Sequence, residues 1–202
     1  MALWLAERPL VLASKSAGRR ALLESAGIPI EVVPADVDER AIEARAADCG
    51  AGEVAALLAR AKAAAVAAQM PGRLVLGADQ TLALGQRRFS KPADRAVARD
   101  QLQTLRGKTH VLHSALAVAR DGAIVFEHRE DARLTMRMFS DGFLDRYLDA
   151  AGDAVTASVG AYQVERIGIQ LFERIEGSHF TILGLPLLPL LDFLRREGCL
   201  SA

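Results

Sequence analysis

One carboxylate stands out as a candidate for chemistry. Asp79 directly follows Leu74 to Ala78, an apolar run typical of a strand that is covered on both faces. Ligands of open α/β sheets bind outside the carboxyl ends of strands, where a carboxylate can hold a divalent metal or take a proton from water. Asp79 is therefore a candidate catalytic residue, although an Asp that simply begins a turn would give the same pattern.

A candidate anion site lies where the first predicted helix begins. The segment Ser14 to Arg20 reads SKSAGRR and follows a short apolar run at 10–13. A helix N-terminus offers free backbone N–H groups and positive partial charge, and Ser16 and the planar fork of Arg19 suit phosphate oxygens. A serine-capped helix with two solvated arginines is the simpler interpretation of this segment alone.

Lysine is rare in this chain, because the 25 basic residues comprise only four lysines and 21 arginines. A rare lysine can mark a site that needs a compact ammonium. Lys62 falls on the apolar stripe of a predicted helix, and Lys91 precedes a proline in a predicted loop. Either could reach a phosphate, but a snorkelling side chain and plain exposure explain them equally well.

Glu39 ends the acidic turn at 36–39 and is a candidate second carboxylate on a metal, or merely the acid that starts a short helix. Together with Asp79 and Glu39, the four cations are what a metal-assisted reaction on a polyphosphate needs; they are Lys15, Arg19, Lys62 and Lys91. Their spacing alone does not place them in one cleft.

These candidates fall among alternating strands and helices. Strands are predicted at 10–13, 31–34, 74–78, 109–120, 123–136, 160–164 and 170–173, with a small hairpin at 81–89. Helices are predicted at 17–26, from the acidic turn to about 49, and at 52–69, 94–105, 140–150 and 185–196. The pattern predicts one α/β domain over residues 1–202 with two lobes and a waist near 106–108.

Composition excludes several classes of protein. The 202 residues carry zero net charge and only 5% aromatics, which disfavours duplex DNA, anionic membranes and single-stranded nucleic acid as partners. The densest apolar stretch, 183–191, is too short to span a membrane. Cys49 and Cys199 are expected to be reduced thiols in a cytosolic protein.

The four histidines lack the spacing of a zinc site. His110 and His113 lie three apart on a predicted strand and should point to opposite faces, each in a structural or surface role.

Several motifs, in order and over nearly the full length, resemble the Maf family of nucleotide pyrophosphatases. They are LASKSAGRR at 12–20, the turn at 36–39, Lys62, GADQT at 77–81, Lys91-Pro92 with Leu102, Leu105, Gly107 and His110, the segment 160–168, LFERIEG at 171–177, and Gly184-Leu185-Pro186. The resemblance implies an elongated two-lobed Maf/ITPase-like α/β fold around a central mixed sheet. It also implies a cytoplasmic protein, often a homodimer, with a cleft beside the sheet.

The implied activity is hydrolysis of nucleoside triphosphates to monophosphate and pyrophosphate with a divalent metal, Mg²⁺, Mn²⁺ or Co²⁺. Asp79 would be the catalytic residue and a metal ligand, with Glu39 as the second ligand. The resemblance assigns phosphate binding to Ser16, Arg19, Lys62 and Lys91. A nucleotide-binding regulator of septum formation, with little turnover, is the alternative that the same family implies.

Departures from the motifs bear on the substrate. Gln80 and Glu165 stand where the branch that acts on dTTP and UTP has Thr and Gln, and both resemble the branch that prefers 7-methyl-GTP. Gly18 matches neither branch, because one has Arg there and the other a bulky residue. We therefore expect a house-cleaning hydrolase of modified nucleotides with a preference for 7-methyl-GTP.

Overall fold

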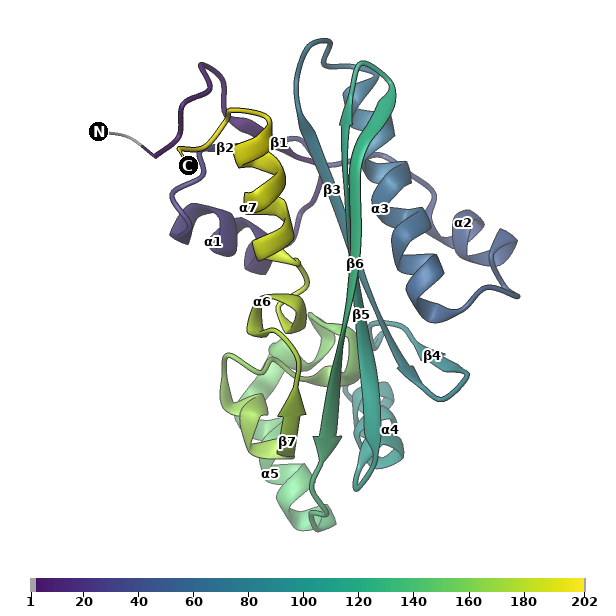
Figure 1. Cartoon of the computed structure of the whole chain (residues 1–202). Helices are drawn as coiled ribbons and strands as arrows, with labels where there is room; N and C mark the ends of the chain where they lie inside the picture. The colour runs from purple at the N-terminus through teal and green to yellow at the C-terminus, as the bar shows by residue number, and fades with distance from the viewer. Residues whose placement is uncertain (1–2, 202) are drawn as a thin grey trace.

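A mixed β-sheet runs the length of the molecule and carries helices on both faces (Figure 1). The computed structural model describes residues 3–201, within which the sheet has seven strands in the order β2-β1-β3-β5-β6-β7, with β4 paired to β3. The strands are β1 (Leu10–Leu12), β2 (Ile30–Val32), β3 (Val75–Leu84), β4 (Arg87–Phe89), β5 (Thr109–Arg120), β6 (Ala123–Met136) and β7 (Phe172–Glu176). Within the described residues the pairs β1–β2 and β1–β3 are parallel and the other strand pairs are antiparallel, so the predicted α/β class with a mixed sheet is confirmed.

Six of the helices match the predicted ones in order, with shifts at their ends, whereas α6 and the 3-10 turns were not predicted. They are α1 (Ala17–Ser25), α2 (Glu39–Arg45), α3 (Ala51–Ala67), α4 (Arg95–Leu105), α5 (Asp141–Ala151), α6 (His179–Ile182) and α7 (Leu187–Arg196), with 3-10 turns η1 (Gly152–Thr156), η2 (Val159–Ala161) and η3 (Ile167–Leu171). Side-chain caps explain several starts: Ser16, Asp38, Asp94 and Ser140 each accept a hydrogen bond from a backbone N–H three residues on. None of the helices within residues 3–201 combines the length and the apolar character needed to cross a bilayer.

The two faces of the upper sheet use different side chains. Alternate residues of β5 face opposite ways, so that Ala115 and Ala117 pack toward α3 while Leu116 and Val118 pack toward α7. The small side chains let α3 approach the sheet closely. Gly77 of β3 marks the closest point, because a Cβ there would lie 2.2 Å from the backbone oxygen of Ala59.

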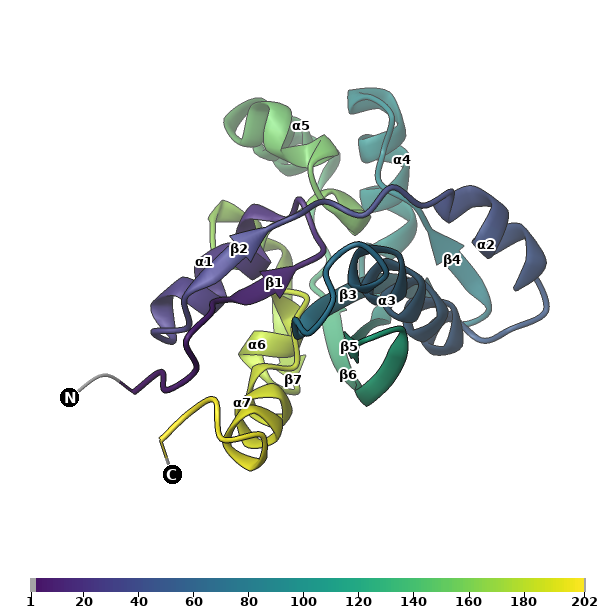
Figure 2. The ribbon, with the colours of Figure 1, turned by 90° about the horizontal axis from the view of Figure 1, so that it is seen from above.

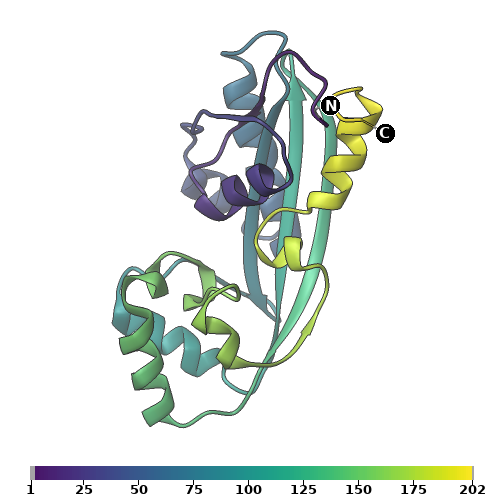
Figure 3. The same cartoon turned by 90° about the vertical axis from the view of Figure 1, so that its left-hand side faces the viewer.

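Two lobes share the long strands (Figures 1 and 3). The upper lobe holds β1, β2, α1, α3 and α7, and seen from above β1 and β2 lie together beside α1 (Figure 2). The lower lobe holds α4, α5 and the 3-10 turns, with β7 at its edge. The predicted waist at 106–108 is wrong, because this segment leads into β5 in the lower lobe, where the Met136 N–H donates to the Lys108 carbonyl. The middle of the long strands joins the lobes instead.

Two strand predictions fail for identifiable reasons. The residues 75–84 form one continuous strand, because β5 pairs with it from Val75 through Ala83, so Asp79 lies inside β3 and not at its end. The segment 160–164 is not a strand, because Gly160 and Ala161 have φ of 80° and 61° and turn the chain sharply. The strand predicted at 170–173 begins at Phe172 and runs to Glu176.

Candidate active site

The edge of β3 opposite β5 has a gap, and Asp79 lies in it. The parallel partner β1 reaches only Leu76, and β4 begins to pair only at Leu82. Asp79 therefore lies beyond the carboxyl end of β1, although it is in the middle of its own strand. The rule that ligands bind past the carboxyl ends of parallel strands applies here through the neighbouring strand.

Asp79 is buried and paired with a buried lysine. The Lys62 Nζ lies 2.6 Å from Asp79 Oδ1 and 2.9 Å from Glu39 Oε1. The side chains of Lys62 and Asp79 are 10% and 11% exposed, whereas that of Glu39 is 52% exposed. One ammonium thus joins two carboxylates from separate elements, β3 and α2. The structure brings together these three candidates, which the sequence left scattered.

The close packing of α3 on β3 produces this contact. Lys62 lies between Ala59 and Ala63 on α3, the two residues that approach Gly77 most closely. Its side chain therefore starts against the strand and runs along it to Asp79, two residues further on. The apolar stripe that places Lys62 toward the sheet also brings its charge to the gap.

Arg19 is buried, and two of its nitrogens donate to protein oxygens. Its Nε donates to the Gly184 carbonyl at 2.8 Å, and its Nη1 donates to the Ala78 carbonyl at 2.8 Å and to Ser14 Oγ at 3.1 Å. Burial lowers the pKa of Arg19, while the nearby charges of Asp79 and Glu39 oppose that effect. Arg19 thus joins the start of α1 to β3 and to the chain at Gly184 beside the gap, while its predicted contact with phosphate stays a prediction.

Gln80 is also held by the protein. Its Nε2 lies within 3.0 Å of Ser114 Oγ and of the carbonyls of Thr181 and Ile182. Ser114 Oγ itself donates to the Thr181 carbonyl. The Gln80 amide nitrogen is therefore held by α6 and by Ser114. The sequence offered no signal for this network, because its other members lie 34 to 102 positions from Gln80.

The remaining candidates line one cleft of about 900 Å³. Its wall includes the predicted metal ligands Glu39 and Asp79. It also includes the predicted phosphate binders and specificity residues, which are Ser16, Gly18, Arg19, Lys62, Gln80, Lys91 and Glu165. Ser16 caps α1, Lys91 follows β4, and Glu165 comes from the turn after η2 in the lower lobe. The predicted catalytic, metal-binding, phosphate-binding and specificity residues thus all line the same cavity.

The oxygen atoms of Asp79 and Glu39 are the donors that could hold a divalent metal. Both can contact a single cation, as their shared ammonium demonstrates, and carboxylate oxygens suit Mg²⁺ and Mn²⁺. Nowhere in the described chain do three or more His, Cys, Asp or Glu side chains gather into such a group. Two carboxylates fit a cation that takes its other ligands from water and substrate phosphates.

A buried polar pair in the lower lobe was not identified from sequence. His110 Nε2 lies 2.7 Å from the Tyr162 hydroxyl, and His110 is completely buried. Burial lowers the pKa of His110 to about 4, so its ring is neutral at pH 7. His113 lies on the opposite face and pairs with Asp131, so the expected alternation of the two histidines is confirmed.

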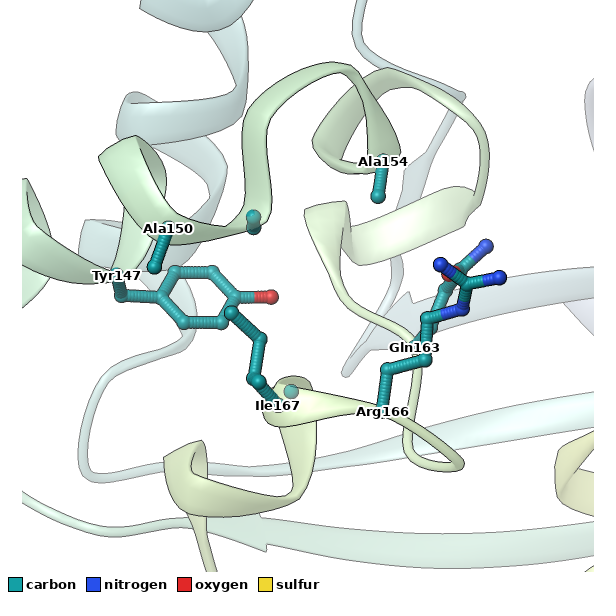
Figure 4. Close-up of a pocket in the computed structure, with 8 residues that line it drawn as sticks. Tyr147, Ala150, Ala154, Gln163, Arg166 and Ile167 are labelled. Carbon is teal, nitrogen blue, oxygen red and sulfur yellow. The ribbon is translucent and has the colours of Figure 1, made fainter.

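A second cavity of about 330 Å³ opens in the lower lobe (Figure 4). Tyr147, three alanines and Ile167 form its apolar part, and Gln163 and Arg166 lie at the other side (Figure 4). The Tyr147 hydroxyl donates to the Ala161 carbonyl, so its polar end is satisfied by the turn that precedes Tyr162. Gln163 lines both cavities, which makes this turn the wall between them.

Comparisons with known proteins agree over nearly the whole chain. Residues 9–197 match the family described as Maf-like protein. The nucleoside triphosphate pyrophosphatases of Bradyrhizobium diazoefficiens and Rhodopseudomonas palustris are 59% and 55% identical over 201 residues, with 100% of each chain covered. The 7-methyl-GTP pyrophosphatase of Brucella abortus is 54% identical over 95% of this chain and 98% of its own. This chain therefore belongs to the family of Maf-like proteins.

Proposed function

We propose that this chain is a nucleoside triphosphate pyrophosphatase, working as one Maf-like domain over residues 1–202. The observation that carries the proposal is the buried Lys62–Asp79 pair, which opens onto a cleft large enough for a nucleotide. Relatives more than half identical over the full length carry that activity in their names. The reaction would break the bond between the α- and β-phosphates and release pyrophosphate.

Asp79 is the group proposed to handle the attacking water. In the free protein its Oδ1 accepts a hydrogen bond from Lys62, which orients the carboxylate in the cleft, where it would orient or deprotonate a water once the nucleotide is bound. The water oxygen would bond to the α-phosphorus while the bridging oxygen leaves with pyrophosphate. Ser16, Arg19, Lys62 and Lys91 would bind the phosphate oxygens, and Arg19 would also hold the edge of β3 in place.

Asp79 and Glu39 are the side chains proposed to hold a divalent metal, Mg²⁺, Mn²⁺ or Co²⁺. When bound, such a cation would neutralise charge on the phosphate oxygens and raise the acidity of a bound water. The protein's own contribution is to aim both carboxylates at one point, which their shared contact with Lys62 does.

The proposed substrate preference is 7-methyl-GTP. Because the Gln80 amide nitrogen is committed to protein acceptors, its Oε1 is the atom left for a substrate, and Glu165 is a second acceptor on the cleft wall. A guanine edge carries N–H donors, which suit two acceptors. Gly18 leaves room for a bulkier side chain, since an added Cβ would have only ordinary contacts at 3.8 Å.

The test is product analysis on a panel of 7-methyl-GTP, dTTP, UTP, CTP, ITP and the standard ribonucleotides with Mg²⁺ or Mn²⁺. We expect monophosphate and pyrophosphate in equal amounts, with 7-methyl-GTP turned over fastest. Preference for dTTP and UTP would refute the specificity argument and leave the reaction class standing. Binding of nucleotides without turnover would refute the proposed hydrolytic activity. It would support the alternative that the chain is a nucleotide-binding regulator of septum formation.

The assembly and the location proposed for this chain are a homodimer and the cytoplasm. Light scattering on the purified protein tests the first, and a mass of one chain across micromolar concentrations would contradict it.

A further inference from the structure

The cation between the two carboxylates of the cleft belongs to the protein itself. Lys62 Nζ contacts Asp79 Oδ1 at 2.6 Å and Glu39 Oε1 at 2.9 Å. Both distances are those of charge-assisted hydrogen bonds. One oxygen of each carboxylate that could hold a divalent metal is therefore already bound to an ammonium.

The contact with Lys62 has two electrostatic effects on Asp79 and Glu39. Asp79 is nine-tenths buried, and a buried carboxylate without a partner is costly, so Lys62 stabilises its charge while the cleft is empty. The same ammonium opposes a dication, because it competes for the same lone pairs and repels a second positive charge a few ångströms away. A metal that bridges the two carboxylates at the position of the ammonium cannot bind until Lys62 moves.

The ammonium of Lys62 can move to other acceptors within the cleft. Its side chain is a flexible four-carbon stem with three donors, and it lines the cleft in which phosphates would lie. A triphosphate offers new acceptors for the ammonium and further oxygen ligands for the metal. Mg²⁺ commonly binds through one or two carboxylates together with substrate phosphates, which is the set available here once Lys62 has turned away.

We propose that Lys62 occupies the metal position in the free protein and gives up its place only to a metal that arrives with the nucleotide. The proposal rests on the proposed function for the identity of the nucleotide, but the competition between Lys62 and the metal does not depend on turnover. It predicts that the free protein binds divalent metals poorly and that removal of the ammonium improves this binding.

The direct test measures Mn²⁺ binding to the nucleotide-free protein by electron paramagnetic resonance. Lys62→Met should tighten Mn²⁺ binding by ~10-fold or more, since it frees two carboxylates and removes a neighbouring positive charge. Lys91→Met is the matched control, because it removes the same charge from the same cleft at a residue that follows β4, away from the paired carboxylates. Equal tightening in both variants, or none in Lys62→Met, would overturn the proposal.

A second measurement uses the wild-type protein and so does not depend on the folding of a variant. The chain has only four lysines, so the ¹⁵N signal of the Lys62 ammonium can be assigned by nuclear magnetic resonance with single Lys→Arg variants. Millimolar Mg²⁺ alone should leave this signal unchanged, and Mg²⁺ with an α,β-methylene nucleotide should shift it. A shift with Mg²⁺ alone would contradict the proposal.

The two ideas fail separately. If no nucleotide is hydrolysed but Lys62→Met binds Mn²⁺ more tightly, the proposed function falls and the competition stands. If pyrophosphate is released but Lys62→Met binds Mn²⁺ no better, the competition falls and the enzyme stands.

Discussion

The two lobes bury polar groups in opposite ways. In the upper lobe Lys62, Asp79 and Arg19 are buried as charged groups, each in contact with an opposite charge or with carbonyl oxygens. In the lower lobe His110 and Tyr162 are buried beside each other as neutral groups, because burial lowers the pKa of His110 and raises that of Tyr162. Burial alone therefore does not decide whether a polar side chain is charged. The partners that surround the side chain decide it.

The charged groups of the upper lobe and the neutral pair of the lower lobe have different roles. Charges that stay ionised in a buried place are costly and are found where a reaction needs them. The neutral pair satisfies two polar atoms and helps to hold the turn at 160–165, which forms the wall of the cleft. The upper lobe would thus supply the reacting groups and the lower lobe the shape of the site.

The largest effect on stability should come from breaking the charged pair. Lys62→Met leaves Asp79 buried without its main partner and should lower the free energy of unfolding by ~3 kcal/mol. The double variant Lys62→Met/Asp79→Asn should recover most of that loss, because no buried charge remains unpaired. Urea unfolding at pH 7 measures both. A double variant as unstable as the single one would contradict this interpretation of the upper lobe.

The neutral pair should make stability depend on pH. The His110 pKa is about 4 in the folded protein and 6.5 for an ordinary histidine, so the unfolded chain binds a proton first as the pH falls. Its contribution is complete above pH 6.5 and is lost toward pH 4, by ~2 kcal/mol between pH 7 and pH 5. Urea unfolding of wild type and His110→Phe/Tyr162→Phe at both pH values isolates it. An equal loss in both proteins would assign the pH dependence to other groups.

Removal of one member of the neutral pair should have a smaller effect. Tyr162→Phe leaves His110 Nε2 buried without its partner and should cost ~1 kcal/mol of stability at pH 7. The variant His110→Phe/Tyr162→Phe removes both polar atoms and should be closer to wild type than Tyr162→Phe alone. Thermal or urea unfolding of the three proteins compares them, and the reverse order would refute the pairing argument.

The smallest effect should come from an exposed ion pair. Arg20 Nε lies 2.7 Å from Glu24 Oε1 on α1, with both side chains about half exposed at 60% and 47%. Arg20→Ala should change stability by no more than ~0.5 kcal/mol, because solvent screens such pairs. A loss comparable to that of Lys62→Met would remove the distinction between buried and exposed charges in this molecule.

Local signals predicted the elements well. Helix caps and left-handed glycines mark most helix ends, and the hairpin of β5 and β6 turns at Asp121-Gly122, where both φ values are positive. The segment 160–164 is one exception, and β3 is another, because the polar residues Asp79 to Thr81 interrupt its apolar run. Their residue types are typical of a turn. The local sequence does not reveal that β5 pairs with these residues and keeps them extended.

The candidate site was predicted as a set of residues and not as a geometry. Lys62 and Asp79 are 17 positions apart, and only the close packing of α3 at Gly77 brings them together. The protein contacts of Arg19 and Gln80 depend on Gly184, Thr181 and Ile182, more than 100 positions away. Motif order identified the participants, while tertiary packing decides that Arg19 and the Gln80 nitrogen contact the protein.

The central claim is that Asp79 and Lys62 act as one unit in pyrophosphate release. The most direct test is a double-mutant cycle on kcat/KM for 7-methyl-GTP, with Asp141→Asn as a control in the lower lobe. Asp79→Asn should lower kcat/KM by ~10³-fold or more, and adding Lys62→Met should lower it little further, because groups that act together are not additive. Asp141→Asn should match wild type. Activity of Asp79→Asn within about tenfold of wild type, or fully additive losses, would contradict the account.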